Sequence, residues 1–391
     1  MYFFSLRFLL LQPPSGHMPA VIAGYSRSPF TPANRGALAK TRPDDIAAAV
    51  VDKLLEDTGI EPSLVEDLLV GCAFPEAEQG YNLARIITFL TKLPETVPGV
   101  TINRFCGSSM QAIHEAAAKV NSGQGDVFIA GGVESMSRIP MTGFNPLPNP
   151  NLPSEAMTSM GVTAENLSKL HNIGREEQES FAIESHARAS AARESGSFAE
   201  EIVPIKTSAG VVDQDGCIRP GTNSEALARL RPAFDASGTV TAGTSSPLTD
   251  GAAFVLVCSE EFATEHGLEP MARVKSIAVT GCAPEIMGIG PVEASKKALD
   301  RAGLTLEDID IVELNEAFAA QSLAVIGELG LDHEKVNLDG GAIALGHPLG
   351  ASGARITGKA AQLLKKSGGN HALATLCVGG GMGMATVLEK V

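Results

Sequence analysis

The amino-acid sequence predicts an α/β fold made of two duplicated halves, in which helices cover buried sheets. The main observation is that amphipathic helices followed by β-rich runs recur along the chain at a constant spacing. The length of 391 residues supports this, since a single hydrophobic core stops growing near ~250–300 residues. A hydrophobic content of 44% and a charged content of 19% are those of a globular chain rather than a disordered one.

The first repeated pair consists of residues 44–70 and 289–314. In the first segment, apolar residues fall on one helical face, the helix stops at Gly59, and a β-rich run follows at residues 65–70. The second segment has the same pattern and stops at Gly303, so the offset is 303 − 59 = 244. Chance alignment of two amphipathic helices is the alternative explanation.

The second repeated pair begins at Cys106 and at Gly350, and 350 − 106 again gives 244. We expect both segments to be helices, ending near Gly123 and Gly368. Each is followed by a short β-rich run that leads into glycines. The two runs are residues 127–130 and 372–376. Recurrence of the same offset favours duplicated strand–helix units over chance.

The region between the halves has a different character. Residues 141–159 are rich in Pro, Asn and Ser and predict an irregular loop, whereas residues 161–196 predict helices. A strand at residues 251–258 would complete the first half before the second begins near Arg273. The predicted division is an N-terminal extension at 1–18, a first half at 19–140 and 235–272, an inserted lobe at 141–234, and a second half at 273–391.

Composition narrows the functional class. The net charge of −15 argues against a nucleic-acid-binding role, because phosphate binding needs a basic face. Six cysteines without a CxxC pair predict neither a zinc ribbon nor a disulfide scaffold, and they fit a reducing cytoplasmic setting.

The N-terminus leaves two interpretations open. No stretch of the sequence is long and apolar enough for a membrane span. The first 17 residues are apolar with one arginine, so a signal or organellar presequence is one interpretation. An extension outside the fold is the other, because a new strand pattern starts just after Met18.

Cys106 is the first candidate for chemistry. It is expected where a strand ends and a helix begins, so free backbone N–H groups and the positive end of the helix dipole would favour the thiolate. A small buried cysteine is the structural alternative. A nucleophilic cysteine needs a base. His114 cannot be that base, because it lies eight residues along the same helix, about 12 Å away. His347, in a glycine-dense loop before the matching helix of the second half, is better placed, although it could simply shape a turn.

Two further candidates follow strands of the second half. Cys377 comes after the run at 372–376 and precedes three glycines, so it could donate a proton beside an oxyanion site; alone, it would be a core residue. Asn315 follows a strand at 309–314 and could orient a water or a carbonyl oxygen, or cap a helix.

Several other functions lose support. The segment from Gly353 to Lys359 imitates a phosphate-binding loop, but Ala360 replaces the hydroxyl residue that binds magnesium, and the segment continues an amphipathic helix. No GxGxxG follows a strand and no GxSxG occurs, which argues against dinucleotide enzymes and serine hydrolases.

The motifs together resemble the thiolase family, and most closely its degradative 3-ketoacyl-CoA thiolases (acetyl-CoA acyltransferases). The resemblance runs from Met18 to Val391 and rests on four motifs in order: Asn103-Arg-Phe-Cys-Gly-Ser-Ser-Met-Gln-Ala, Asn315-Glu-Ala-Phe-Ala, Gly346-His-Pro-Leu-Gly-Ala-Ser-Gly-Ala-Arg and Cys377-Val-Gly-Gly-Gly-Met-Gly. It implies a thiolase-like fold with layers in the order αβαβα, and an inserted lobe that binds CoA.

The resemblance also implies roles for the site residues. Cys106 would be the acylated nucleophile, His347 would activate it and help to bind the thioester oxygen, and Cys377 would shuttle a second proton. Asn315 would hold the water of a first oxyanion site, and the backbone N–H groups of Cys106 and Gly379 would form a second.

Family positions that contact CoA match Arg219 and Ser246. Arg219 could equally be an ordinary surface arginine. The implied reaction is reversible thiolytic cleavage of 3-ketoacyl-CoA in fatty-acid β-oxidation, with CoA as co-substrate and neither a metal nor a permanently bound cofactor. The expected assembly is a homodimer or homotetramer, with the other β-oxidation enzyme as a further possible partner.

Three alternatives remain at this point. An acetoacetyl-CoA-forming biosynthetic thiolase is less favoured, because that branch often has a His before Met-Gly where this chain has Ser159-Met160-Gly161. A ketosynthase-type condensing enzyme would pair one Cys with two His, or with His and Asn. A non-catalytic acyl-CoA-binding subunit would not need Cys106, His347 and Cys377 together.

Overall fold

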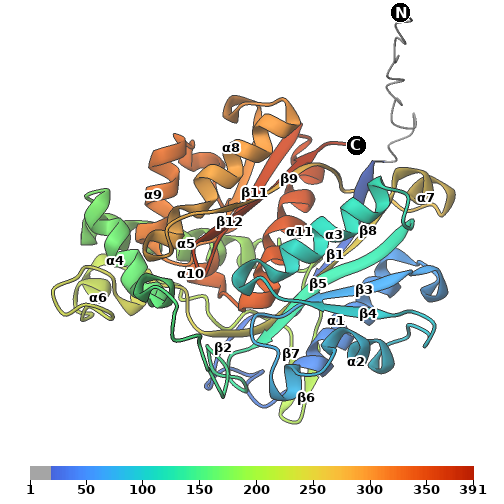
Figure 1. Ribbon diagram of the computed structural model, residues 1–391, viewed down its shortest axis with the longest axis horizontal. Helices are drawn as coiled ribbons and strands as arrows, with labels where there is room; N and C mark the ends of the chain where they lie inside the picture. The colour runs from blue at the N-terminus through green and yellow to red at the C-terminus, as the bar shows by residue number, and fades with distance from the viewer. Residues whose placement is uncertain (1–18) are drawn as a thin grey trace, which may run out of the picture.

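One large mixed sheet organises the molecule (Figure 1). The structure is a computed structural model that describes residues 19–391, so the predicted extension at 1–18 and the two interpretations of it lie outside the described residues. The strands of the sheet are β1 (Ala20–Arg27), β2 (Thr31–Pro32), β3 (Asp67–Gly71), β4 (Gly99–Ile102), β5 (Val127–Ser135), β8 (Thr249–Ser259), β9 (Ala272–Gly281), β10 (Ile311–Leu314), β11 (His371–Val378) and β12 (Met382–Glu389).

The strand order repeats the same arrangement twice. The full order is β10-β11-β12-β9-β1-β8-β5-β3-β4, with β2 beside β8. In each half two strands are parallel, β3 with β5 and β10 with β11, and the next strand is antiparallel, β8 or β12. Within the sheet, as described for residues 19–391, the strands of the two halves pair through two residue pairs between β1 and β9. The duplicated α/β fold predicted from the spacing is therefore confirmed.

Helices separate and cover the two halves in five layers. Helix α1 (Pro43–Thr58) packs on the strands of the first half and α8 (Gly290–Ala302) on those of the second, each ending one residue before the glycine indicated by the sequence. Between the halves, α3 (Ser108–Asn121) and α11 (Leu349–Ser367) contact each other, and α11 contacts strands of both halves (Figure 1). The order of layers is αβαβα, as the resemblance implied. Among residues 19–391, no helix has the length and apolar character of a membrane span.

Small side chains bring α3 and α11 into close contact. A Cβ atom on Gly353 would lie 2.4 Å from the backbone nitrogen of Met110, so only glycine fits there. Beside it, the backbone N–H of Ala354 donates a hydrogen bond of 2.8 Å to Ser109 Oγ. This approach places the N-terminal ends of the two helices side by side between the halves.

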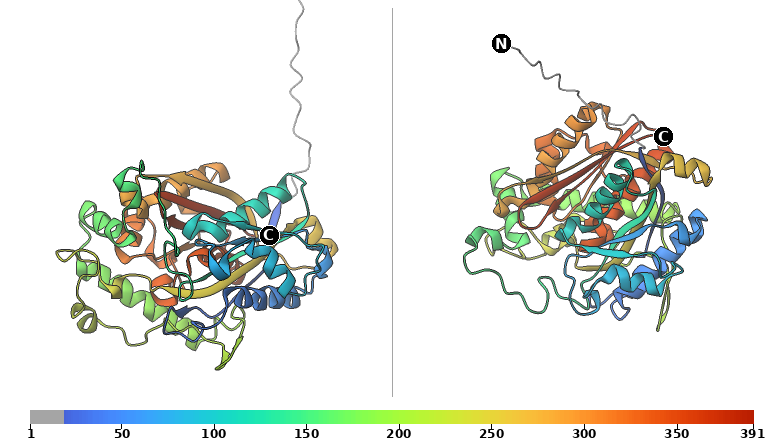
Figure 2. Two further views of the ribbon diagram at one scale, coloured as in Figure 1. Left: turned by 60° about the horizontal axis from the view of Figure 1, so that its bottom comes forward. Right: turned by 45° about the vertical axis from the view of Figure 1, so that its right-hand side comes forward.

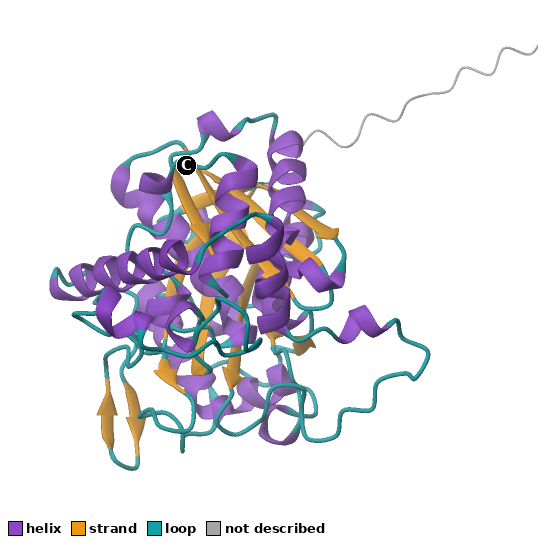
Figure 3. Cartoon of the chain, turned by 90° about the vertical axis from the view of Figure 1, so that its left-hand side faces the viewer, coloured by secondary structure: helices purple, strands orange, loops and turns teal. Residues whose placement is uncertain are grey.

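The segment between the halves folds over one end of the sheet. Residues 141–159 form an extended loop with a single 3₁₀ turn at Ser154–Met157 (Figure 2). Three helices follow: α4 (Met160–Leu170), α5 (Arg175–Glu194) and α6 (Ser224–Ala228). The loop and the first two helices agree with the sequence prediction. A separate hairpin of β6 (Ile205–Thr207) and β7 (Gly210–Val212) was not predicted (Figure 3).

The remaining helices are shorter or peripheral. They are α2 (Leu83–Leu90), α7 (Glu260–Glu265), α9 (Ala319–Leu329) and α10 (Ala342–Leu345). The strands β9 and β12 were also absent from the sequence prediction. Both lie in the second half. Most residues of β12 are apolar and both of its faces are buried, so it lacks the alternation of polar and apolar residues that marks a half-exposed strand.

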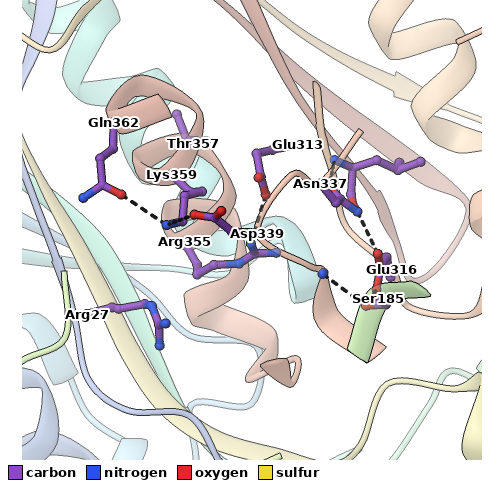
Figure 4. Close-up of polar contacts among 12 residues, drawn as sticks. Arg27, Ser185, Glu313, Glu316, Asn337, Asp339, Arg355, Thr357, Lys359 and Gln362 are labelled. Carbon is purple, nitrogen blue, oxygen red and sulfur yellow. Dashed lines mark hydrogen bonds and ion pairs between the residues drawn. The ribbon is translucent and has the colours of Figure 1, made fainter. Parts of the chain in front are cut away.

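Buried ion pairs fasten the inserted lobe to both halves. Glu201, from the lobe, pairs with Arg27 of β1 at 2.7 Å and with Lys359 of α11 at 2.6 Å. Lys359 also pairs with Asp339 at 3.0 Å (Figure 4), and Asp215 of the lobe binds Arg27 through both carboxylate oxygens. The segment from Gly353 to Lys359, which imitates a phosphate-binding loop, is thus part of the buried helix α11. Its lysine pairs with Glu201 and Asp339.

The variant Lys359→Met should destabilise the protein by about 3–5 kcal/mol at neutral pH, because it leaves Glu201 buried with one cation fewer. Burial alone would raise the pKa of Glu201, but Lys359 and Arg27 hold it below the ordinary value. Glu201 therefore stabilises the fold above its unfolded pKa, and this contribution is lost as the pH falls through the folded pKa. Urea unfolding should show the difference between variant and wild type holding at pH 7 and shrinking once the pH falls below the ordinary glutamate pKa of 4.5.

The exposed pair Lys296–Glu293 supplies the control, since Lys296→Met should change stability by less than about 1 kcal/mol. Equal effects of the two substitutions would contradict a central role for the buried pairs.

Candidate active site

Cys106 sits in a tight turn between β4 and α3. It belongs to the 3₁₀ turn Phe105–Gly107, and Phe105 has a φ of 44°, in the left-handed region that is costly for a residue with a bulky side chain. The turn is held by Asn103 Oδ1, which accepts from the Phe105 N–H at 2.9 Å, and by Ser108 Oγ, which donates to the Phe105 carbonyl at 2.6 Å. The thiol is half-buried. The predicted junction of strand and helix is confirmed.

The end of β11 meets this turn. The backbone N–H of Gly379 points at the Cys106 thiol. Cys377, buried at the end of β11, is near enough that a charge on Cys106 raises its pKa. A Cβ on Gly107 would meet the side chain of Val378 at 2.9 Å, so the two segments are in direct contact. The structure therefore brings Cys106, Cys377 and Gly379 together.

His347 is buried immediately before α11. Its Nδ1 lies 2.5 Å from Ser352 Oγ, and that hydroxyl donates to the Pro348 carbonyl at 3.1 Å, so the hydroxyl oxygen accepts from Nδ1–H. Its backbone N–H donates to Thr249 Oγ1 at 3.0 Å. This arrangement fixes the tautomer in which Nε2 carries a lone pair and can accept a proton.

Asn315 links β10 to the same place. Its side-chain Nδ2 lies 3.4 Å from His347 Nε2, and its backbone N–H donates to the Thr375 carbonyl at 3.0 Å. The other side-chain atom, Oδ1, is buried without a hydrogen-bond partner in the described part of the chain. An unpaired buried acceptor is costly, so this oxygen is suited to accept a hydrogen from a water or a substrate group.

Electrostatics corrects one expectation. Burial raises the pKa of Cys106 to about 11; the N–H of Gly379 opposes the rise and the Glu134 carboxylate adds to it. Burial, together with the positive charge of Arg355, lowers the pKa of His347 to about 3. The backbone N–H groups do lower this pKa, as the sequence predicts, but desolvation outweighs them, so the thiolate is not favoured overall. Thiol and imidazole are both neutral at pH 7.

The two predicted CoA contacts lie in different settings. Ser246 is beside the Asn315 turn, since its backbone N–H and its hydroxyl both donate to the Ala317 carbonyl at 3.0 Å. Arg219 is exposed on the inserted lobe, and its backbone N–H donates to His186 Nδ1 at 3.1 Å. Its positive charge lies close enough to His186 to lower the pKa of that imidazole, second to burial.

Some residues of the site were missed from the sequence. Ser352 and Thr249 hold His347, and the buried carboxylate of Glu316 accepts from Ser185 Oγ at 2.7 Å and from Asn337 Nδ2 at 2.9 Å (Figure 4). Ser352 lies five residues after His347, and Glu316 directly follows Asn315, so adjacency to a candidate was an available signal. Thr249 is distant in sequence and gave none. Within residues 19–391 no cluster of His, Cys, Asp and Glu is arranged to hold a metal ion.

Duplicated halves with a cysteine at the start of one central helix, and a histidine before the other, define a class of acyl-transferring enzymes. The profile of the thiolase N-terminal domain matches residues 20–261, and that of the thiolase C-terminal domain matches residues 268–390. The chain belongs to the thiolase family.

Individual relatives cover nearly the whole chain. The 3-ketoacyl-CoA thiolase of Pseudoalteromonas translucida (strain TAC 125) is 49% identical over 384 residues, which cover 95% of this chain and 98% of the relative. The 3-ketoacyl-CoA thiolase of Bacillus subtilis (strain 168) is 47% identical over 386 residues, covering 95% and 99%.

Solved structures agree in fold. The human mitochondrial 3-ketoacyl-CoA thiolase superposes with a TM-score of 0.89 at 37% identity, covering 96% of this chain and 100% of that one. The acetyl-CoA acetyltransferase of Bacillus anthracis superposes with a TM-score of 0.88 at 40% identity, covering 96% and 99%.

A neutral thiol gives a distinct alkylation profile. The rate at which iodoacetamide labels Cys106 should rise about tenfold per pH unit between pH 7 and pH 10 without a plateau, because the thiolate fraction grows at that rate below the pKa. Peptide mass spectrometry after short exposure measures it, with Cys106→Ser as the control. A rate independent of pH near neutrality would instead indicate a thiolate–imidazolium pair.

Proposed function

We propose that this chain is an acetyl-CoA C-acyltransferase that cleaves 3-ketoacyl-CoA with CoA, giving acetyl-CoA and a shortened acyl-CoA. The proposal is carried by two neighbouring pairs, the thiols of Cys106 and Cys377 and the side chains of His347 and Asn315. Contact of α11 with α3 and with the Cys106 turn supports placing both pairs in one site. The names of the relatives at 47–49% identity support the same reaction. In this reading the enzyme serves fatty-acid β-oxidation.

In the first half-reaction the Cys106 thiol loses its proton to Nε2 of His347 as the sulfur bonds to the 3-keto carbon. Two neutral partners suit this transfer, because no separated charge has to persist in the buried site before substrate arrives. The bond between carbons 2 and 3 then breaks. The acetyl-CoA carbanion takes a proton from Cys377, and the acyl group stays on Cys106.

In the second half-reaction free CoA removes the acyl group. The Cys377 thiolate takes the proton of the CoA thiol, the CoA sulfur attacks the acyl carbon, and Cys106 leaves with the proton returned by His347. A water held by Asn315 Oδ1 and the His347 Nε2–H group would bind one oxyanion. The backbone N–H groups of Cys106 and Gly379, which already face the thiol, would bind the other.

The inserted lobe at residues 141–234 would bind CoA. It would lie between the first half, made of residues 19–140 and 235–272, and the second half, residues 273–391. Ser246 lies next to the Asn315 turn, so a pantetheine chain passing it would lead towards the thiols. Arg219 is exposed, and its positive charge could bind the phosphates at the nucleotide end of CoA. CoA is then a co-substrate, with no resident cofactor and no metal, and we propose a cytoplasmic location.

Acetoacetyl-CoA synthesis is the second candidate reaction, because the reaction is reversible and one structural relative is an acetyl-CoA acetyltransferase. The side chain of Met160 borders the site: it packs in the apolar cluster that contains Cys377, and its sulfur would lie 3.6 Å from a Cβ on Gly379. Loop residues 141–160 would therefore set the acyl length that is accepted. A rate series over acyl-CoA chain lengths separates the two reactions.

Removing Cys377 should separate the two kinds of chemistry. Cys377→Ala should slow the cleavage of acetoacetyl-CoA by about 10²–10⁴-fold, measured as loss of the enolate absorbance, because the carbanion loses its proton donor. The exchange of labelled CoA into acetyl-CoA should persist, because no carbanion forms and Cys377 keeps its proton throughout. His347 alone can protonate the departing CoA and then take the proton of the labelled CoA thiol. Cys106→Ser should abolish both.

The variant Cys258→Ala, at a buried core cysteine of β8, is the matched control and should retain both activities. Full cleavage by Cys377→Ala would favour a ketosynthase-type site. Saturable acyl-CoA binding without acetyl-CoA formation by the wild type would favour a non-catalytic subunit.

We propose a homodimer that forms through the β4 edge of the sheet. Within residues 19–391, β4 ends the sheet and has no partner strand on its outer side, and unpaired edges are surfaces on which a second copy can add. Beside it Tyr81, Phe89 and Leu90 are 96%, 61% and 47% exposed. A homotetramer, or association with the other β-oxidation enzyme, would use further surfaces.

Light scattering should give the mass of at least two 40.5 kDa chains for the wild type. The double variant Phe89→Glu and Leu90→Glu should shift the mass towards one chain, because the charges cannot be buried in an interface. Val211→Glu, at an exposed valine of the β6–β7 hairpin, is the control and should leave the mass unchanged. A monomeric wild type would refute the dimer.

A further inference from the structure

Glu134, on β5, is a buried carboxylate that the reaction described above does not use. It is 1% exposed, and its hydrogen-bond donors within residues 19–391 are all uncharged. They are four N–H groups and one thiol: the backbone N–H groups of Ala73 at 2.8 Å, Phe74 at 3.3 Å and Gly350 at 2.9 Å, the Gln79 side-chain amide at 2.7 Å and the Cys72 thiol at 3.6 Å. Burial raises the pKa of Glu134, and the hydrogen bonds from these N–H groups offset only part of that rise.

The contact with Gly350 ties Glu134 to His347. Gly350 lies in the first turn of α11, three residues after His347, where backbone N–H groups have no partner inside the helix. A Cβ on Gly350 would lie 2.8 Å from the Glu134 Oε2 atom, so the fit depends on glycine. The carboxylate also faces the positive end of the α11 dipole. It therefore fixes the helix end that carries the imidazole.

The contact with Phe74 ties Glu134 to Cys106. The Phe74 ring lies 6.0 Å from the Phe105 ring, centroid to centroid, and Phe105 forms the turn that holds the nucleophile. Phe74, Cys106 and Leu349 pack around one apolar cluster. One carboxylate thus contacts the supports of both reacting side chains, and its negative charge is close enough to act on the Cys106 sulfur.

We propose that Glu134 is a positioning residue for acyl transfer, which holds the start of α11 through Gly350 so that His347 faces Cys106. The inference rests on the proposed function. The same carboxylate lies close to the turn that carries Cys106, so its negative charge also disfavours a thiolate there before substrate arrives. This effect ends once the sulfur bonds to the acyl carbon and its negative charge is consumed.

Other ionisable groups face this arrangement and stay the same in the test. Cys72 lies beside Glu134, with its sulfur 3.6 Å from Oε1. Cys377 lies beside Cys106, and Arg355 acts on His347 from α11. A change in the alkylation profile after neutralising Glu134 is therefore assigned to its own charge.

The variant Glu134→Gln keeps the size of the side chain and removes the charge. We expect iodoacetamide to label Cys106 about three- to tenfold faster at pH 8, a shift of half to one pH unit. In turnover, kcat should fall by about tenfold or more while KM for CoA changes less than about twofold, because Glu134 does not touch substrate. Alkylation needs no turnover, so its result stands apart from any failure of the proposed reaction.

The variant Glu134→Asp keeps the charge and shortens the reach to Gly350. It should lower kcat while the alkylation profile stays that of the wild type. If Glu134→Gln does not fold, kcat of Glu134→Asp still tests the positioning role. Glu165→Gln is the matched control, since Glu165 is a buried carboxylate that accepts the Thr239 and Val240 N–H groups, and should leave the profile unmoved.

An unchanged labelling rate in folded Glu134→Gln would overturn the charge effect. Wild-type kcat in Glu134→Asp would overturn the positioning role. Faster labelling in Glu165→Gln as well would show a general loosening of the fold and would also count against the proposal.

Discussion

The close approach of α3 and α11 is the constraint on which the site depends. Gly353 lets the two helices touch backbone to side chain, and Ser109 cross-links them by a hydrogen bond. Because each helix begins beside one catalytic candidate, this contact sets the separation between Cys106 and His347. The neighbouring parallel strands β10 and β11 end at the same edge of the sheet, where they place Asn315 and Cys377. The duplication thus turns one structural unit into two complementary halves of a site.

Burial explains the electrostatic character of this site. Burial raises the pKa of the Cys106 thiol and lowers that of the His347 imidazole, so both groups are neutral at pH 7. The ionic form is reached only as bonds change, when backbone N–H groups and the Asn315 oxygen have charge to stabilise. In such a site the Cys106 thiol stays protonated and unreactive in the absence of substrate. The proposed effect of Glu134 acts in the same direction.

Much of the fold could be predicted from local signals. The helices at α1, α3, α8 and α11 were predicted because their apolar period and terminal glycines are written in short segments. The strands β9 and β12 were not, since their pairing depends on contacts across the sheet. For the site, Cys106, His347, Cys377 and Asn315 stood in recognisable motifs, whereas Thr249 and Glu134 act through distant partners. The sign of the Cys106 shift was missed because desolvation follows from three-dimensional packing.

The ion pairs of Glu201 also bear on how specificity can change in this family member. The lobe that would receive the substrate tail is bolted to β1 by Arg27 and to α11 by Lys359, inside the core. Swinging this part of the lobe outward would separate the carboxylates of Glu201 and Asp215 from Arg27 and Lys359, so it is held firmly on the core. Sequence change is therefore tolerated more readily in the exposed loop at 141–159 than in this anchored segment.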